Sequence, residues 1–359
     1  MKILITGSEG YIGSVLGPYL LRHGHDVRGI DCGFYCDGQL FDPGEPRPQL
    51  TAKDIRHLDT ADVTGSDAVV HLAELSNDPL GEHDQRLTYD INHRGSLNLA
   101  LICRAAGVRR FVYTSSCSVY GAGDEGVKTE ESAPNPQTAY ARSKILVERD
   151  VHAMANERFT PVFLRNATAY GASPRMRFDI VLNNLAGHAW TSGEIKMTSD
   201  GTPWRPLVHV NDICEAIKLA LEAPREAVHN QIFNVGSSEQ NYRIRDIAEI
   251  IAEAFPGCTV TYGRPSGDNR SYRVSFDKIG RHLPAFRCQW TAESGARQLR
   301  EIFQRIGMDR EIFNYRAFTR LQQLKHLLAT QQIDSEFYFS RTERGGRRKI
   351  DLAANVASR

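Results

Sequence analysis

Short apolar runs and amphipathic stretches alternate along the first half of the chain. The apolar runs are nearly continuous, and they lie at Lys2–Thr6, Asp26–Ile30, Ala68–Leu72, Arg110–Thr114 and Pro161–Leu164. In the stretches between them, such as Tyr11–His23 and Tyr89–Ala106, apolar residues recur at helical spacing. This alternation predicts an α/β fold built on a doubly wound parallel sheet, the Rossmann arrangement, with helices on both faces.

The second half of the chain has a more mixed pattern. Helices are predicted at Phe178–Thr191, Asn211–Ala223 and Ile244–Phe255, and strands at Ile195–Met197 and Gln231–Val235. Asn211 is the expected N-cap of its helix. Two more helical patterns follow Trp290, one of them carrying Phe318, Leu321, Leu324, Leu327 and Leu328. The segment Gly33–Pro48 is rich in Gly and Pro and predicts a loop after the second strand. These elements predict a smaller α/β lobe beside the sheet.

Composition excludes several classes of protein. The 359 residues include 44 basic and 43 acidic side chains, so the net charge of +1 gives no footprint for nucleic acid or an anionic membrane. No apolar run is long enough to span a bilayer, and the N-terminus is too poor in apolar residues for a signal peptide. The basic tail from Arg341 is expected to be a frayed terminus.

The seven cysteines are scattered and form no CxxC pair. This pattern predicts free thiols in a reducing, cytoplasmic setting, with no disulfide framework and no metal site. Cys32 and Cys36 are four residues apart, but no second ligand pair accompanies them.

A glycine-rich turn between the first strand and the first helix predicts a dinucleotide site. Gly7, Gly10 and Gly13 permit a tight turn and close approach of the backbone to a pyrophosphate. Asp31 ends the second strand, where its carboxylate can accept hydrogen bonds from a ribose 2′-OH and would repel a 2′-phosphate. No arginine immediately follows Asp31, so the predicted cofactor is NAD rather than NADP.

A second constellation predicts proton transfer. Tyr140 and Lys144 share one face of a predicted helix, and the lysine charge would favour the tyrosine phenolate. Tyr140 is therefore a candidate general acid or base. Ser115 and Ser116 follow the strand Arg110–Thr114, at the carboxyl edge where open α/β sheets bind ligands.

With these motifs in order, the sequence resembles the extended short-chain dehydrogenase/reductase family, in the branch of NAD-dependent nucleotide-sugar epimerases and dehydratases. The resemblance spans about residues 1–290. Further matching elements are Asp54-Ile55, His71-Leu72-Ala73, Asn92, Ser115-Ser116-x-x-Val119-Tyr120-Gly121, Leu164-Arg165 with Tyr170-Gly171, and Arg205-x-x-Val208-His209-Val210-x-Asp212.

The resemblance implies a role for each matching position. Ser116, Tyr140 and Lys144 match the catalytic residues, with Lys144 also holding the cofactor ribose. Together with the glycine turn and Asp31, the implied cofactor contacts are Gly7, Gly10, Tyr11, Ile12, Gly13, Asp31, Asp54, Ile55, Leu72, Ala73, Ser76, Asn92, Ser115, Tyr140, Lys144 and Asn166. The implied substrate contacts are Ser76, Ser116, Cys117, Ser118, Tyr140, Thr168, Asn184, Arg205, Arg264 and Asp268.

The sequence also departs from the family pattern. The 4,6-dehydratase branch has Asp-Glu directly after the catalytic Ser/Thr, where this chain has Cys117 and Ser118. Loss of water needs an acid and a base at that place, so dehydratase activity is not expected. Thr168 replaces the usual Asn, and the Arg264–Asp268 element carries one inserted residue. Cys117 is expected either to face the sugar or to pack as a buried thiol.

The combined expectation is an epimerase of a nucleotide-activated sugar, acting at C4 through a transient keto sugar. A reductase of a nucleotide 4-keto sugar is the alternative, followed by a non-catalytic NAD-sensing protein. The expected organisation is a cofactor domain over residues 1–170, completed by 207–235, and a substrate lobe over 171–206 and 236–335. Residues 340–359 are expected to form a flexible tail, and the resemblance implies a homodimer.

Overall fold

A seven-stranded parallel sheet forms the centre of the molecule. The computed structural model describes residues 1–76, 78–122, 126–264 and 271–340. In spatial order the sheet comprises β11 (Gln231–Val235), β7 (Thr160–Asn166), β5 (Arg110–Ser116), β4 (Ala68–His71), β1 (Lys2–Thr6), β2 (Asp26–Asp31) and β3 (Gln49–Ala52). The chain order reverses between β1 and β4. In doubly wound sheets, ligands bind at such a reversal, outside the carboxyl ends of the strands.

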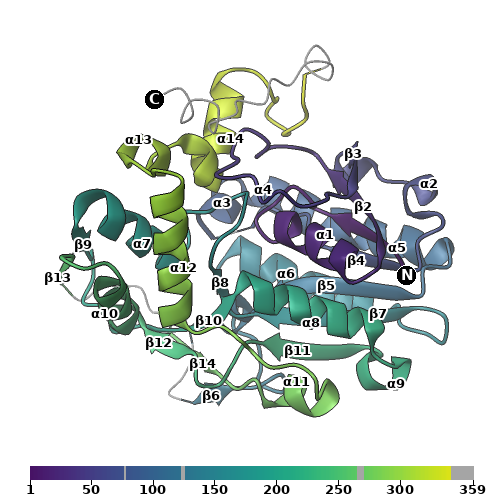
Figure 1. Ribbon diagram of the computed structural model, residues 1–359. Coiled ribbons are helices and arrows are strands. Elements are labelled where there is room, and N and C mark those ends of the chain that lie inside the picture. The colour runs from purple at the N-terminus through teal and green to yellow at the C-terminus, as the bar shows by residue number, and fades with distance from the viewer. Residues whose placement is uncertain (77, 123–125, 265–270, 341–359) are drawn as a thin grey trace.

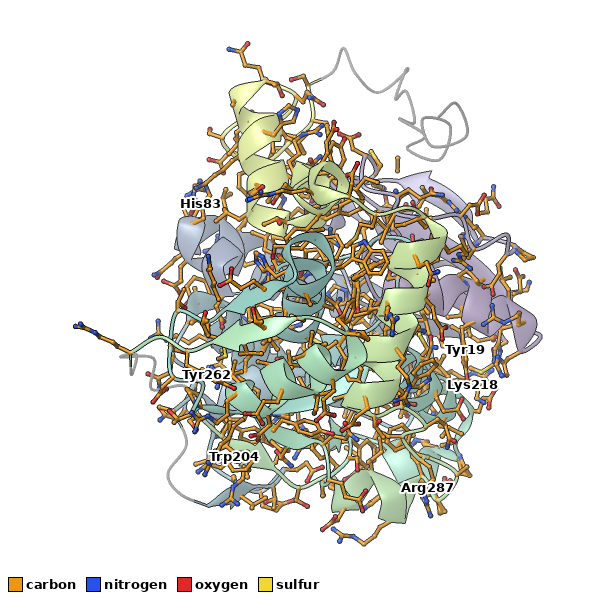
Figure 2. The ribbon with its side chains drawn as sticks, turned by 60° about the vertical axis from the view of Figure 1, so that its left-hand side comes forward. Tyr19, His83, Trp204, Lys218, Tyr262 and Arg287 are labelled. Carbon is orange, nitrogen blue, oxygen red and sulfur yellow. The ribbon has the colours of Figure 1, made fainter. Side chains whose placement is uncertain are left out.

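Helices cover both faces of this sheet, as predicted. On one face, α1 (Gly13–Arg22) packs beside α8 (Val210–Glu222), and their apolar side chains share a core cluster with β1 and β7 (Figure 1). Tyr19 of α1 hydrogen-bonds to Glu215 of α8, which also pairs with Lys218, and Figure 2 shows Tyr19 and Lys218 close together. On the other face, α5 (Ser96–Ala105) and α6 (Ala139–His152) bury a second cluster.

A smaller lobe stands against the carboxyl edge of the sheet. Its helices α7 (Val181–Ser192), α10 (Ile244–Ala254) and α12 (Ala292–Arg305) surround a third apolar cluster. Two small sheets belong to the lobe: in one, β10 (Trp204–His209) lies between β12 (Asn241–Arg243) and β8 (Thr168–Tyr170), and in the other β13 (Thr259–Thr261) pairs with β9 (Glu194–Lys196). Of the segment 207–235, β11 therefore extends the large sheet, whereas β10 belongs to the small one.

The remaining elements are short. They are η1 (Ile55–His57), α2 (Thr60–Val63), α3 (Asp78–His83), α4 (Gln85–Thr88), η2 (Tyr89–Gly95), η3 (Cys117–Tyr120), β6 (Val127–Lys128), α9 (Arg225–Val228), β14 (Arg273–Val274), α11 (Asp277–His282), α13 (Arg310–Phe313), η4 (Arg316–Phe318) and α14 (Arg320–Ala329).

The end of the described chain folds back over the part of the molecule that contains β1, β2 and β3. We call residues 316–340, which comprise η4, α14 and the following turn, the C-terminal arm. Leu324 and Leu327 of α14 are buried in the same cluster as Phe34 and Ile55. In Figure 1 the yellow α14 lies close to α3, far from the α10 end of the smaller lobe. The arm thus contacts both parts of the molecule: Phe318 packs against Phe178 in the lobe cluster, whereas α14 packs beside Phe34 and Ile55.

Local boundaries differ from the predicted ones for identifiable reasons. The helix expected at Asn211 begins at Val210, and its cap is His209, whose Nδ1 accepts the Asn211 N–H at 3.2 Å. Asn211 was therefore wrongly predicted as the cap. The stretch Tyr89–Ala106 divides into the π-helical turn η2 and α5. The edge strand β3 was missed because it has only four residues and all four are exposed.

Within the described residues, no helix combines the length and apolar character that crossing a membrane requires. All seven cysteines are free thiols. The same residues contain no group of three or more His, Cys, Asp or Glu side chains arranged to hold a metal ion.

Candidate active site

A cavity of about 480 Å³ opens at the carboxyl edge of the large sheet and extends beneath the smaller lobe. Its walls combine the glycine turn after β1, the ends of β2, β4 and β5, and residues of β8 and β10. The cavity is long enough to be lined by Asp31 at one end and by Tyr140 and Arg205 at the other. It is therefore placed where the strand order reverses and where both halves of the chain meet.

The glycine turn lets the backbone form one wall of this cavity. Gly7 has φ +74°, and a Cβ there would lie 2.7 Å from the backbone nitrogen of Ala73. A Cβ on Gly13 would lie 2.2 Å from the Gly7 carbonyl oxygen. Neither position tolerates a side chain, so the turn stays close to β4 and presents the α1 N-terminus to the cavity. Gly10, Tyr11 and Ile12 complete this lining.

Asp31 ends β2 with its carboxylate held in place. Its Oδ2 accepts the Glu9 N–H at 3.0 Å, and its Oδ1 accepts the Gly33 N–H at 2.6 Å. Burial raises the pKa of this carboxyl above its ordinary value, while both backbone donors act in the opposite direction. The side chain lines the cavity and retains lone pairs that can accept a hydroxyl hydrogen bond.

Asp54 and Ile55 lie at the same end of the cavity as Asp31. The Asp54 carboxylate accepts the Arg56 backbone N–H at 2.8 Å and pairs with the Arg56 guanidinium at 2.8 Å. Tyr35 also lines this end, and its hydroxyl oxygen is buried with no hydrogen-bond partner among the described residues. This end therefore offers an apolar surface for a base and polar groups for its ribose.

Leu72, Ala73 and Ser76 follow β4 and line the middle of the cavity. Asn92, which the resemblance placed on the cofactor, lies outside the lining and is fully buried. Its Oδ1 accepts the Leu75 N–H at 2.8 Å and its Nδ2 donates to the Leu75 carbonyl at 3.1 Å. Asn92 thus supports the loop that contacts the cavity instead of lining it.

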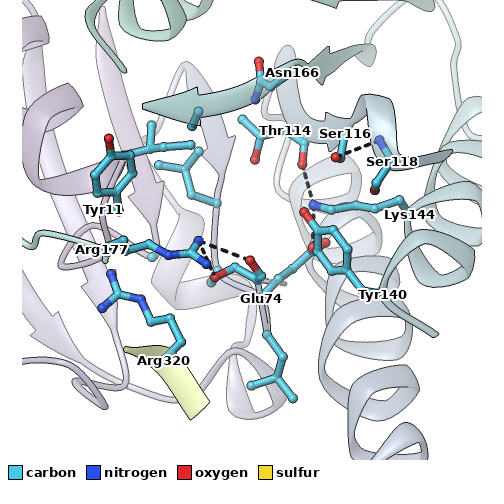
Figure 3. Close-up of a pocket in the computed structure, with 18 of the residues that line it drawn as sticks. Tyr11, Glu74, Thr114, Ser116, Ser118, Tyr140, Lys144, Asn166, Arg177 and Arg320 are labelled. Atoms are coloured by element: carbon cyan, nitrogen blue, oxygen red, sulfur yellow. Dashed lines mark hydrogen bonds and ion pairs between the residues drawn. The ribbon is translucent and has the colours of Figure 1, made fainter. Parts of the chain in front are cut away.

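The three predicted catalytic residues line one wall of the cavity. Thr138 caps α6 by accepting the Ala141 N–H at 3.2 Å, so that Tyr140 lies in the first turn of the helix. Lys144 is 4% exposed, and its Nζ donates to the Thr114 carbonyl at 2.6 Å. Figure 3 shows Tyr140 and Lys144 beside Ser116, which ends β5. Tyr140 lines the cavity, where its side chain can meet a ligand.

Glu74 is a functional candidate that sequence reasoning missed. Its side chain is buried, it forms an ion pair with the Lys144 ammonium, and it accepts the Tyr113 hydroxyl at 2.6 Å. Burial raises the pKa of Glu74, whereas Lys144 and Tyr113 stabilise its ionised form. The available signal was a single carboxylate directly after the apolar run that ends at Ala73.

The carboxylate of Glu74 changes the electrostatics of the catalytic pair. The sequence predicted that Lys144 lowers the pKa of Tyr140. In the structure, burial raises the pKa of Tyr140 above its ordinary value; Lys144 acts in the opposite direction and Glu74 adds to the rise. The lysine charge is partly neutralised by Glu74, so the protonated tyrosine is favoured while this ion pair persists.

The opposite wall carries Thr168 and Arg205, and the Arg205 guanidinium lies 5.7 Å from the ring centroid of Tyr272. Ser118 and Asn166 also line the cavity, and each has a buried oxygen with no hydrogen-bond partner among the described residues. Buried polar atoms of this kind indicate a polar ligand. Ser115 contacts the cavity, but its hydroxyl donates to Glu148 at 2.5 Å.

Some predicted substrate residues do not reach the cavity. Cys117 is 1% exposed, its Sγ donates to the Arg165 carbonyl at 3.1 Å, and it packs in the core, so the prediction that it faces the sugar is corrected. Asn184 donates to the Phe178 carbonyl at 2.8 Å and lies outside the lining. Arg264 is exposed and also outside it. Asp268 lies outside the described residues.

Comparisons with known proteins agree with this geometry. The family described as "NAD dependent epimerase/dehydratase family" matches residues 3–236. A UDP-glucose 4-epimerase of Corynebacterium glutamicum is 30% identical over 312 residues, covering 82% of this chain and 91% of the relative. A solved structure of MoeE5 with UDP-glucuronic acid and NAD is 26% identical, with a TM-score of 0.71, covering 85% of this chain and 99% of that one.

The fold is shared more widely. The structure of TunA, described as an NAD-dependent NDP-hexosamine 5,6-dehydratase, has a TM-score of 0.75 at 24% identity, covering 85% of this chain and 98% of that one. The glycine turn, Asp31 and the buried polar atoms of the cavity all suit a dinucleotide. The chain belongs to the NAD dependent epimerase/dehydratase family and is an NAD-dependent enzyme.

Proposed function

We propose that the protein epimerises a nucleotide-activated sugar at C4. The observation that carries the proposal is the single cavity in which Tyr140, Ser116 and Lys144 face Thr168 and Arg205 of the smaller lobe. A cavity shared between cofactor and substrate walls suits a reaction in which the two ligands touch. The UDP-glucose 4-epimerase relatives support the same reaction class.

Each side chain of the site has a distinct chemical role in the proposed reaction. Tyr140 takes the proton from the sugar hydroxyl and later returns it, since its own hydroxyl is the accessible acid–base group of the wall. Ser116 donates a hydrogen bond to the same sugar oxygen. Lys144 stabilises the tyrosinate and orients the cofactor ribose. Bound NAD supplies reversible hydride transfer at the sugar carbon. Arg205 is positioned to bind the diphosphate of the substrate.

The surroundings of Ser116 favour epimerisation over loss of water. The positions that carry an acidic pair in the 4,6-dehydratase branch hold Cys117, which is buried in the core, and Ser118, a neutral hydroxyl. Neither can remove and donate protons at adjacent sugar carbons near neutral pH, because burial also raises the pKa of the Cys117 thiol. A homodimer and a cytoplasmic location are further predictions, from the resemblance and the cysteine pattern.

The alternative is a reductase of a nucleotide 4-keto sugar, because reduction uses the same Tyr140 and Lys144. The two are distinguished by incubating the purified protein with UDP-glucose, UDP-galactose and UDP-glucuronic acid. Epimerisation gives the C4-inverted sugar by NMR with no net change in NADH absorbance. Stoichiometric NADH consumption with a 4-keto sugar nucleotide, and no inversion of any sugar tested, would assign the reductase instead. Tyr140→Phe controls for a contaminating enzyme.

A further inference from the structure

Two buried arginines from distant parts of the chain line the same stretch of the cavity. Arg177 precedes α7, and Arg320 is the first residue of α14 in the C-terminal arm. Figure 3 shows both guanidinium groups on the side of the cavity where Tyr11 lies, across from Tyr140 and Lys144. Arg320 lies beyond the residues that the family match covers, 3–236.

Arg320 is a buried cation whose guanidinium forms no ion pair with a carboxylate in the described chain. Arg320 is 2% exposed, and its guanidinium donates to the carbonyls of Ala317 and Arg175, each at 3.3 Å. The guanidinium also stacks 4.0 Å from the ring centroid of Tyr35. Burial, followed by the nearby charge of Arg177, lowers the pKa of Arg320 to about 10. A buried cation in this state is stabilised by a bound anion.

Arg177 extends the same positive surface toward the catalytic wall. Its Nε donates to Asp179 at 2.8 Å, and its Nη1 donates to the Ser76 carbonyl at 3.2 Å. Asp179 also accepts the Arg320 backbone N–H at 3.2 Å, and the charges of both arginines act on its carboxylate. Against this anion the two arginines carry one excess positive charge; the nearby Asp31 carboxylate also acts on Arg320 but is held by the N–H groups of Glu9 and Gly33.

The two arginines occupy the stretch between the ends that hold a dinucleotide. Asp31 and Tyr35 mark the adenosine end, and Tyr140 marks the nicotinamide end. The part of NAD that spans such a gap is the pyrophosphate, which in this fold lies at the glycine turn and the α1 N-terminus. Tyr11 of that turn lies beside both arginines in Figure 3.

We propose that Arg320, together with Arg177, binds the pyrophosphate of the cofactor, and that the C-terminal arm thereby keeps NAD bound between turnovers. The inference depends on NAD being the cofactor and does not depend on which reaction takes place at the sugar. Arginine suits this position because its planar fork donates two hydrogen bonds to phosphate oxygens.

The arm is anchored at the adenosine end by contacts that do not involve the ligand. Arg316 pairs with Asp37 at 2.9 Å, and Gln323 donates to the Phe34 carbonyl at 3.0 Å. Further along, Arg56 donates to the Glu336 carbonyl at 2.8 Å. Release of the cofactor past Arg320 therefore requires the arm to separate from the loop after β2.

The test compares Arg320→Gln with Lys325→Gln, which removes the same charge from the exposed face of the same helix. Binding of ADP-ribose, adenosine and UDP to cofactor-free protein is measured by NMR titration. Arg320→Gln is expected to weaken the binding of ADP-ribose about ten- to hundred-fold, as for loss of a charged hydrogen bond. The affinity for adenosine is expected to stay unchanged. Lys325→Gln leaves all three unchanged. In the holoenzyme, Arg320→Gln releases NAD faster than the wild type does.

Three outcomes would overturn the proposal. Equal weakening of adenosine and ADP-ribose would show that Arg320 only shapes the adenosine pocket through Tyr35. Unchanged ADP-ribose binding would remove the contact altogether, and loss of UDP binding alone would place the arginine on the substrate diphosphate. If Arg320→Gln does not fold, as judged by thermal unfolding without ligand, Arg320→Lys must show the same selective loss for ADP-ribose at smaller magnitude.

Discussion

Tyr140 is the residue on which the proposed chemistry depends. Its hydroxyl faces the cavity while its ring packs on the wall, so Tyr140→Phe removes the proton-transfer group with little change in shape. The rate of sugar inversion is expected to fall about 10²- to 10⁴-fold, with NAD content and thermal unfolding unchanged. The measurement is turnover at saturating sugar nucleotide beside the NAD content of the purified variant. Full activity in Tyr140→Phe would refute the assignment.

Glu74 predicts a particular pH dependence. The titratable and charged groups that interact with it are Lys144 and Tyr140 on α6 and Tyr113 on β5. Because the Glu74 charge raises the pKa of Tyr140, Glu74→Gln lowers it. The limb of the pH–rate profile on which the tyrosinate forms should therefore move to lower pH.

The readout for Glu74 is the position of that limb and not the absolute rate. A merely structural role would lower activity at all pH values without moving the limb. Glu74→Asp, which keeps the charge, should leave the limb near its wild-type position. A profile unmoved by Glu74→Gln would show that the carboxylate does not act on Tyr140.

Asp31 predicts the choice between the two nicotinamide cofactors. Its carboxylate, fixed by the N–H groups of Glu9 and Gly33, accepts a ribose hydroxyl and repels a phosphate. Asp31→Ser should narrow the preference for NADH over NADPH, chiefly by improving NADPH binding. Tighter binding of NADPH than NADH by the unmodified protein would contradict this account of Asp31.

At the scale of the element, the junction of β1 and α1 depends on the absence of side chains. A Cβ on Gly13 would lie 2.2 Å from the Gly7 carbonyl oxygen. Because this oxygen belongs to the backbone, it cannot move away as a flexible side chain could. Gly13→Ala is expected to lower thermal stability and to abolish copurification of NAD. Gly280→Ala in α11 is the matched control, because its nearest neighbour is 4.0 Å away and alanine favours helix. Equal effects of the two substitutions would contradict the close packing at Gly13.

At the scale of the whole molecule, the sequence predicted the architecture well where the burial of apolar residues alone determines the element. Strands β1, β4, β5 and β7 were found because each contains an unbroken run of buried apolar residues, and β2 because Val27 and Ile30 are buried within it. The catalytic wall followed from Ser116, Tyr140 and Lys144, which the sheet edge brings together.

The parts that the sequence did not predict depend on contacts between distant segments. Cys117 and Asn92 occupy positions of the family motifs. Only the packing shows that the Cys117 side chain lies in the core and that the Asn92 side chain binds the backbone of Leu75. Glu74 becomes a functional candidate only because the fold places its carboxylate beside Lys144. Arg320 belongs to a helix whose apolar spacing indicated burial, with nothing in the spacing to indicate which half of the molecule it would cover.

The central claim is that this cavity inverts C4 by removing and returning one hydride. The most direct measurement uses UDP-glucose or UDP-galactose carrying deuterium at C4, followed by NMR and mass spectrometry without added NADH. The account predicts the C4-inverted sugar nucleotide with deuterium still at C4 and no NADH released. Absence of inversion in every sugar nucleotide tested, or product whose deuterium has been lost to solvent, would contradict it.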